Sequence, residues 1–242
     1  MVSIIGIGMD GEKTLTAEAL SAIKKADILI GAQRMTALFE SLGKPTFRSW
    51  KSEEIAAFLH SEKYENAAVL MSGDCGFYSG AEKLLGLIED IESEVISGIS
   101  SPVYFCSKIK KPWKNMKFVS LHGENASIVR NVRRNEFCFF LLGGEVTPAK
   151  LCQRLCEYKM GETKIYIGEN LASENERIFV GKASDFTDIS LGKLTVAITE
   201  NSNFEKGTAT GIPDENFTRG KVPMTKSEVR STVISKLEPS RN

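Results

Sequence analysis

Three glycine-bearing segments of the sequence combine residue types that bind and position a small ligand. They span residues 6–11 (GIGMDG), 72–80 (SGDCGFYSG) and 97–102 (SGISSP), and each follows a short run that we predict to be a β-strand. Glycine lets a backbone approach a ligand closely, and aspartate and serine side chains hydrogen-bond to ammonium and hydroxyl groups. Ligands of open α/β sheets bind outside the carboxyl ends of the strands, so we expect these segments to form one binding site.

The first segment matches the G-x-G-x-x-G pattern that holds a dinucleotide pyrophosphate at a helix N-terminus. Two features count against a nicotinamide site. Residues 12–15 intervene before the next periodic segment, so no helix opens at the third glycine. The position expected for a ribose-binding acid is occupied by Gly-Ala-Gln-Arg at residues 31–34, and Asp27 lies at the other end of that strand. A nicotinamide-dependent oxidoreductase is therefore the less favoured alternative.

The second segment is the most informative, because it follows the continuous apolar run 67–71 expected of a strand that is covered on both faces. Asp74 could accept hydrogen bonds from an ammonium group or a ribose hydroxyl of the ligand. The structural alternative is an Asp-Gly turn whose aromatic residues, Phe77 and Tyr78, fill the core. The sequence leaves both interpretations open.

Serine and histidine residues complete the set of candidates. Ser100 and Ser101 either cap the next helix or bind polar groups of the ligand. His122 stands at the carboxyl end of a predicted strand and is the candidate base, whereas His60 lies on a predicted helix and is expected at the surface. The sequence has no G-x-S-x-G motif and no lysine after the first glycine loop, which disfavours hydrolase and kinase functions.

Cysteine usage and overall charge exclude further classes of protein. The five cysteines are odd in number and scattered, so we expect buried thiols, and Cys152 and Cys156 lack the second ligand pair of a metal site. With 31 basic and 31 acidic residues among 242, the chain lacks the positive charge of a nucleic-acid binder. No run of residues is long and apolar enough for a membrane span, and the N-terminus has no signal-peptide pattern. We expect a cytoplasmic protein without a metal, a nucleic-acid partner or a membrane.

Alternating strands and helices predict an α/β fold. Strands are predicted at residues 2–7, 27–30, 67–71, 94–96, 118–121, 137–142, 164–167 and 194–198. Helices are predicted at residues 16–25, with Ala19, Leu20 and Ile23 on the buried face, and from Ser52 and Thr147 onward. The polar segment 110–114 (KKPWK) predicts a hinge between an N-terminal α/β domain (1–113), with a mostly parallel sheet, and a C-terminal α/β domain (114–205), with a mixed sheet.

The remaining residues, 206–242, form a tail of different character. A glycine- and threonine-rich stretch precedes a predicted helix at residues 225–237. Val229, Val233 and Leu237 recur at four-residue spacing on this helix, an apolar stripe that has no partner within its own segment.

Four motifs in this order resemble the tetrapyrrole methylases. They are the first glycine turn followed by Leu15-Thr16, Gly-Asp-x-Gly-Phe-Tyr-Ser at 73–79, Gly-Ile-Ser-Ser at 98–101, and Ser-Leu-His-Gly at 120–123. The resemblance, which spans about residues 2–200, implies two α/β domains with S-adenosylmethionine in the cleft between them, usually in a homodimer. It also implies methyl transfer to C-5 of a precorrin-6 intermediate of cobalamin biosynthesis, with or without cobalt. Methylases of the same family that act at other ring positions are the alternative.

The resemblance extends the family's functional roles to individual residues. Those expected to contact the cofactor are Gly8, Gly73, Asp74, Phe77, Ser100, Ser101 and Leu142, with the loop 169–171 a looser match. Those expected near the substrate are Asp10 and Tyr78. For the reaction itself we expect His122 either to accept a proton as a base or to have a structural role, and Arg34, Lys108 and Lys110 to bind the macrocycle's carboxylates, with a solvated hinge as the alternative for the lysines. The chain departs from the family's pattern at Met9-Asp10-Gly11, where Pro-Gly-Asp is usual, and at Cys75, where proline is usual.

The tail resembles a different protein, the partner that methylates C-15 of the same macrocycle and decarboxylates it. The similar stretches are residues 211–217 (GIPDENF) and 224–230 (MTKSEVR). The resemblance implies association or fusion with that partner. A scaffold without catalysis, whose tail helix recruits an enzyme, is the alternative from another class of function.

Overall fold

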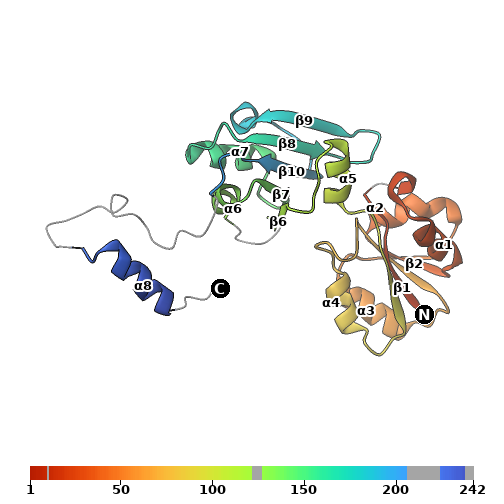
Figure 1. Ribbon diagram of the computed structural model, residues 1–242. Helices are drawn as coiled ribbons and strands as arrows, with labels where there is room; N and C mark the ends of the chain where they lie inside the picture. The colour runs from red at the N-terminus through yellow and green to blue at the C-terminus, as the bar shows by residue number, and fades with distance from the viewer. Residues whose placement is uncertain (10, 122–126, 206–223, 238–242) are drawn as a thin grey trace. The chain divides into compact units, whose positions relative to one another are not determined.

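The computed structural model describes residues 1–9, 11–121, 127–205 and 224–237 of the chain. The chain divides into two compact units, Met1–Phe204 and Glu205–Asn242. Figure 1 shows the elements of both units, coloured from red at the N-terminus to blue at the C-terminus.

The first sheet has five parallel strands in the order β3-β2-β4-β1-β5. The strands are β1 (Val2–Gly6), β2 (Ile28–Gly31), β3 (Thr46–Arg48), β4 (Ala67–Met71) and β5 (Ser93–Ile96). The helices between them are η1 (Gly11–Thr14), α1 (Ala17–Lys25), α2 (Gln33–Thr36), η2 (Ala37–Leu42), α3 (Ser52–Ser61) and α4 (Ala81–Leu87). One face of the sheet packs against α3 and α4 and the other against α1 and η2, which explains why every residue of β1 and β4 is buried.

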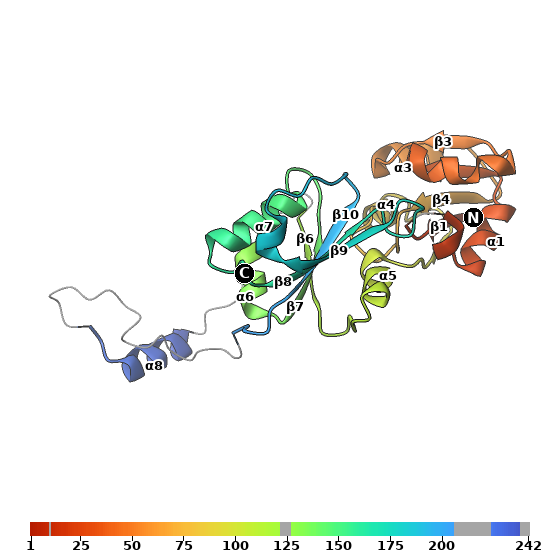
Figure 2. The same ribbon diagram turned by 90° about the horizontal axis from the view of Figure 1, so that it is seen from above.

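The second sheet is mixed and has the order β6-β7-β10-β8-β9. The strands are β6 (Lys117–Ser120), β7 (Phe137–Leu141), β8 (Lys164–Glu169), β9 (Arg177–Lys182) and β10 (Thr195–Glu200), and only β6 and β7 pair in parallel. The helices are α5 (Ser101–Lys108), α6 (Ile128–Arg134), α7 (Pro148–Glu157) and η3 (Ala183–Phe186). Helices α6 and α7 cover one face and α5 covers the other, as Figure 2 shows from above.

The structure confirms the predicted α/β fold, the parallel first sheet and the mixed second sheet. Caps predicted from the sequence are present: the Thr16 hydroxyl accepts a hydrogen bond from Ala19 N (3.1 Å), and Pro148 follows the N-cap residue Thr147. One prediction on α1 is wrong, because Leu20 is 36% exposed and only Ala19 and Ile23 of the expected face are buried. The short strands β3 and β9 were not predicted.

The boundary after residue 113 remains a prediction. Helix α5 precedes that boundary in sequence, yet its buried residues Phe105 and Cys106 pack with Phe139 and Tyr166 of the second sheet. The chain therefore begins to pack against the second sheet at α5, before the polar segment 110–114.

The second unit contains α8 (Ser227–Leu237), in agreement with the predicted tail helix. Its apolar residues Val229, Val233 and Leu237 are 50%, 49% and 71% exposed, so the stripe is uncovered. Among the described residues, no helix has the length and apolar character required to cross a bilayer.

Candidate functional site

The three glycine segments converge at the carboxyl ends of β1, β4 and β5. Gly8 and Gly73 exchange two backbone hydrogen bonds, with N–O distances of 3.1 and 2.5 Å. Asp74 Oδ2 accepts a hydrogen bond from Gly98 N (3.0 Å), which ties the second segment to the third. The contact at Gly6 is so close that an added Cβ would lie 2.7 Å from Gly98 N and 2.8 Å from Gly73 O. These glycines are therefore required for the packing of the three loops against one another.

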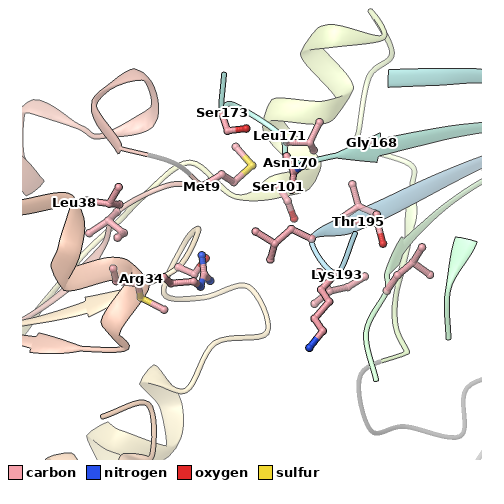
Figure 3. A pocket seen from close by; sticks show the side chains of 17 residues that line it. Met9, Arg34, Leu38, Ser101, Gly168, Asn170, Leu171, Ser173, Lys193 and Thr195 are labelled. Carbon is pink, nitrogen blue, oxygen red and sulfur yellow. The ribbon is translucent and has the colours of Figure 1, made fainter. Parts of the chain in front are cut away.

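A cavity of about 360 Å³ opens beside these loops and takes residues from both sheets (Figure 3). Its first-sheet side includes Ile7, Met9 and Ser72 together with residues of α2 and η2. The residues of α2 and η2 are Arg34, Met35 and Leu38. The remaining lining residues are Ser101, Leu141, Leu142, Gly168, Asn170, Leu171, Ser173, Lys193, Leu194, Thr195 and Val196. The lining combines apolar side chains with hydroxyl and amide groups and two cations, which is the composition of a small-molecule site.

The structure brings the predicted residues Ser101, Leu142 and Arg34 to this cavity, together with Asn170 and Leu171 of the predicted loop 169–171. Ser100 lies next to it as the N-cap residue of α5 and is buried, without a side-chain hydrogen bond to the helix. Asp74 instead accepts hydrogen bonds from Gly98 N and from Gly76 N (2.9 Å), so its carboxylate organises the loops.

The aromatic residues of the second segment lie at a different hollow. Phe77 packs edge-on against Phe118 (5.5 Å between ring centres) and Phe139 (5.9 Å), which is the core-filling alternative of the sequence analysis. Tyr78 is half exposed with a left-handed backbone (φ +47°) and lines a separate hollow of about 420 Å³ together with Cys75, Gly76, Phe77, Ser79, Glu82 and Phe118.

The sequence analysis did not identify the cavity residues at the start of β10 and just before it. Strand β10 runs antiparallel to β7 and β8, so Thr195 pairs with Glu169 and Val196 with Leu141. The beginning of β10 therefore lies beside the carboxyl ends of its neighbours. A search limited to carboxyl ends of strands does not include Lys193, Leu194 and Thr195.

Two carboxylates hold the second-sheet side of the cavity. Glu169 is 2% exposed, and its oxygens accept hydrogen bonds from Gly192 N (2.6 Å) and Arg177 Nε (2.6 Å). The Gly192 N–H and then the Arg177 side chain outweigh burial and hold the pKa of Glu169 below its usual value. Glu176 accepts hydrogen bonds from Tyr104 Oη and Ala172 N, both at 2.7 Å.

Lys108, one of the cations predicted to bind the macrocycle, contacts other side chains of the protein. Its Nζ lies 3.1 Å from Glu176 Oε1, an internal ion pair, and its pKa is raised by hydrogen bonds with Tyr104 and Glu176. Neither Lys108 nor Lys110 lines the cavity. Arg34 is therefore the one cation of that predicted set that lies at the site.

Cysteine chemistry does not contribute to the site. Four of the five thiols are buried, as predicted, and Cys156 is half-buried. Burial raises the pKa of Cys75 and Cys106 to about 11 and that of Cys138 and Cys152 to about 12. At neutral pH these four groups are thiols rather than reactive thiolates. Within the described part of the chain, no group of three or more His, Cys, Asp or Glu side chains is placed to hold a metal ion.

Two predicted residues, Asp10 and His122, lie outside the described residues. The four-residue 3-10 helix η1 begins at Gly11, the third glycine of the first segment, and the α-helix α1 begins only at Ala17. The nucleotide-binding arrangement, in which an α-helix opens at the third glycine, is thus not formed.

Comparison with known proteins assigns the chain to a family. The family model for tetrapyrrole (corrin/porphyrin) methylases matches residues 1–187. A probable cobalt-precorrin-7 C(5)-methyltransferase of Methanocaldococcus jannaschii is 32% identical over 211 residues, which cover 83% of this chain and 98% of the relative. A precorrin-6Y C(5,15)-methyltransferase (decarboxylating) of Sinorhizobium sp is 26% identical over 248 residues, covering 99% of this chain and 60% of the relative.

A solved structure has the same fold. Uroporphyrin-III C-methyltransferase of Thermus thermophilus, complexed with S-adenosylhomocysteine, superposes with a TM-score of 0.69 at 15% identity, covering 82% of this chain and 96% of the other. The family match, the relatives and the fold agree with the four ordered motifs of the sequence. This chain belongs to the tetrapyrrole (corrin/porphyrin) methylases.

Proposed function

We propose that this protein transfers a methyl group from S-adenosylmethionine to C-5 of a precorrin intermediate in cobalamin biosynthesis. The observation that carries the proposal is the cavity lined by Ser101, Leu142 and Asn170 in a chain that aligns with nearly the whole length of a cobalt-precorrin-7 C(5)-methyltransferase. The family membership favours this function over a nicotinamide-dependent oxidoreductase and over a scaffold.

The residues of the cavity fit S-adenosylmethionine in chemistry and size. A volume of about 360 Å³ falls in the range of small-molecule sites. Leu142, Leu171 and Val196 offer apolar surface to an adenine ring, and Ser101 and Asn170 offer hydroxyl and amide groups to its polar substituents. Gly8, Gly73 and Asp74 support the site by linking the loops beside it through hydrogen bonds, and Ser100 is the N-cap residue of α5.

The bound cofactor supplies a methyl group on a positively charged sulfur, which is a strong electrophile. The macrocycle supplies the electron pair from an enamine-like bridge carbon, so the protein needs no nucleophile of its own. Its residues align the two reactants and exclude water from them. In this proposal His122 accepts the proton that the methylated carbon releases, and Tyr78 and Asp10 contact the macrocycle.

Arg34 is the proposed anchor for the carboxylates of the macrocycle, with Lys193 as a second cation of the same cavity. A guanidinium pairs with a carboxylate through two parallel hydrogen bonds, which suits a substrate that carries many carboxylates. The two cations come from α2 and from the segment before β10, respectively.

We further propose a cytoplasmic homodimer that associates with a protein that methylates C-15 of the same macrocycle. Support for the partner comes from the alignment with the C(5,15)-methyltransferase, which covers 99% of this chain and hence α8, and from the exposed apolar stripe of that helix. Sedimentation equilibrium tests the dimer, because a mass near 26.6 kDa would contradict it.

Calorimetric titration with S-adenosylhomocysteine tests the proposed cofactor. We expect micromolar affinity for this product and no binding of NADPH. Ser101→Leu fills the cavity and is expected to abolish binding, whereas Ser107→Leu at an exposed position of the same helix retains it. A folded wild-type protein that binds NADPH or neither compound would overturn the proposal.

A further inference from the structure

We infer that Glu176 is a positioning residue of the cofactor site: its carboxylate joins α5 to the turn at residues 170–173, so that Ser101 and Asn170 stay directed at one cavity. The inference deepens the proposed function and rests on it. Figure 3 shows Ser101, Asn170 and Leu171 among the side chains that line the cavity. Glu176 does not line the cavity, and it acts through the residues that do.

Glu176 makes three polar contacts with two separate segments. Its Oε2 accepts hydrogen bonds from Tyr104 Oη and from Ala172 N, each at 2.7 Å. Its Oε1 lies 3.1 Å from Lys108 Nζ, and that ammonium lies 5.0 Å from the centre of the Tyr104 ring. The Glu176 side chain is only 20% exposed, so these contacts are partly shielded from water. One carboxylate thus links a helix and a turn that are about 70 positions apart in the sequence.

The turn at residues 170–173 requires such support because its backbone is strained. Asn170 and Ala172 have φ values of +48° and +70°, a left-handed conformation that costs energy for residues other than glycine. Asn170 N donates to Leu194 O (2.9 Å) and Ser173 N donates to Asn170 O (3.1 Å). The Ala172 N–H donates a hydrogen bond to the Glu176 carboxylate, and this bond holds the strained backbone of Ala172 in place.

Helix α5 connects the Glu176 contact to Ser101 at the cavity. Its first residue, Ser101, lines the cavity, and Tyr104 follows less than one helical turn later. The segment before α5 is tied to the first sheet by the hydrogen bond from Gly98 N to Asp74. A shift of α5 along the second sheet would therefore move Ser101 relative to Asn170.

Electrostatics keep the contact charged at neutral pH. Burial alone would raise the pKa of Glu176, but the hydrogen bonds from Tyr104 and Ala172 and the ion pair with Lys108 outweigh it and lower the pKa. An ionised carboxylate accepts all of these hydrogen bonds at once, and charge-assisted bonds are stronger than neutral ones.

The test compares affinity for S-adenosylhomocysteine with stability in three variants. We expect Tyr104→Phe, which removes one hydrogen bond, to weaken binding about fivefold, and Glu176→Ala to weaken it more than about tenfold. Glu176→Gln keeps an acceptor for Ala172 N and restores part of the affinity. In turnover assays the KM for S-adenosylmethionine rises with the same order of variants, while kcat changes less than about twofold.

Glu54→Ala is the matched control. Glu54 also accepts a hydroxyl hydrogen bond, from Ser49 Oγ (2.7 Å), and pairs with Lys51 Nζ (2.7 Å), but it lies on α3 and does not line the cavity. This variant should lower thermal stability without changing the affinity. Equal affinity in wild type, Tyr104→Phe and Glu176→Ala would overturn the inference, and Tyr104→Phe decides if Glu176→Ala fails to fold. Absence of binding by the wild type would instead overturn the proposed function.

Discussion

Gly98 lies where the ends of three parallel strands come into contact. A Cβ at this position would overlap the carbonyl oxygens of Gly73 and Gly6, which are backbone atoms that cannot move aside without disturbing β1 and β4. We expect Gly98→Ala to lower the free energy of unfolding by about 3 kcal/mol and to weaken S-adenosylhomocysteine binding, since the shifted segment leads into Ser101. Urea denaturation and calorimetry measure the two effects.

Gly86 provides the control for this substitution. It lies in α4, and an added Cβ there would meet no atom within 4 Å. Gly86→Ala should therefore raise the free energy of unfolding by about 0.5–1 kcal/mol through the better helix propensity of alanine, with unchanged ligand affinity. Equal stability of the two variants would show that the close packing at Gly98 has no energetic consequence.

At the same scale, the structure brings together the loops that the sequence singled out by their glycine, serine and aspartate residues, and Ser101 and Leu142 line the cavity. The binding roles of the individual residues stay predictions. The pattern did not show that Asp74 would bind Gly98 N, because the acceptor and donor come from different loops. Pairings of this kind depend on tertiary structure, and a single sequence contains no direct signal for them.

Among the elements, β8 and β9 are held together by an ion pair next to the cavity. Glu169 and Arg177 face each other in the antiparallel register, and the buried carboxylate also accepts the Gly192 N–H. We expect Glu169→Gln to lower the free energy of unfolding by about 2 kcal/mol at pH 7, since hydrogen bonds to a charged group are lost. Urea denaturation at a series of pH values measures this difference.

The pH dependence of that variant has a defined sign. The pKa of Glu169 is lower in the folded protein than its ordinary value of 4.5, so the folded state favours the ionised form. Its stabilising contribution is complete above about pH 4.5 and is lost as the pH falls through the lower folded value. The difference between wild type and Glu169→Gln should shrink in this acidic range, whereas Glu174→Gln, at an exposed position of the loop that follows β8, should match the stability of wild type at pH 7.

Element predictions succeeded where burial determines the pattern. The continuous apolar run of β4 and the Thr-Pro start of α7 are local signals, and the structure confirms both. Strands β3 and β9 are edge strands in which every residue is exposed or half-buried. Strand β3 has only three residues, and the apolar residues Ile178, Phe179 and Val180 of β9 were not recognised as part of a strand. The antiparallel direction of β10 could not be predicted either, and this direction brings Thr195 to the cavity.

For the whole molecule, the division at Phe204 predicts that the first unit is independent of the tail. The four hydrophobic clusters that the described residues form lie within Met1–Phe204, and no residue of α8 is buried. A chain that ends at residue 204 should therefore keep the melting temperature of the full chain within about 2 °C, since apolar burial dominates stability. It should also keep the full affinity for S-adenosylhomocysteine, because the cavity takes all its residues from this unit.

The same truncation separates the function of the tail from that of the site. If α8 binds a C-15 methylating partner through its exposed stripe, the shortened chain loses that association while it retains cofactor binding. Val233→Asp and Leu237→Asp in the full chain should reproduce the loss, because burying a charge in an apolar interface is costly. Ser231→Asp on the same helix, outside the stripe, is the control. A truncated chain that melts lower or binds S-adenosylhomocysteine less tightly would instead show that the tail supports the methylase unit itself.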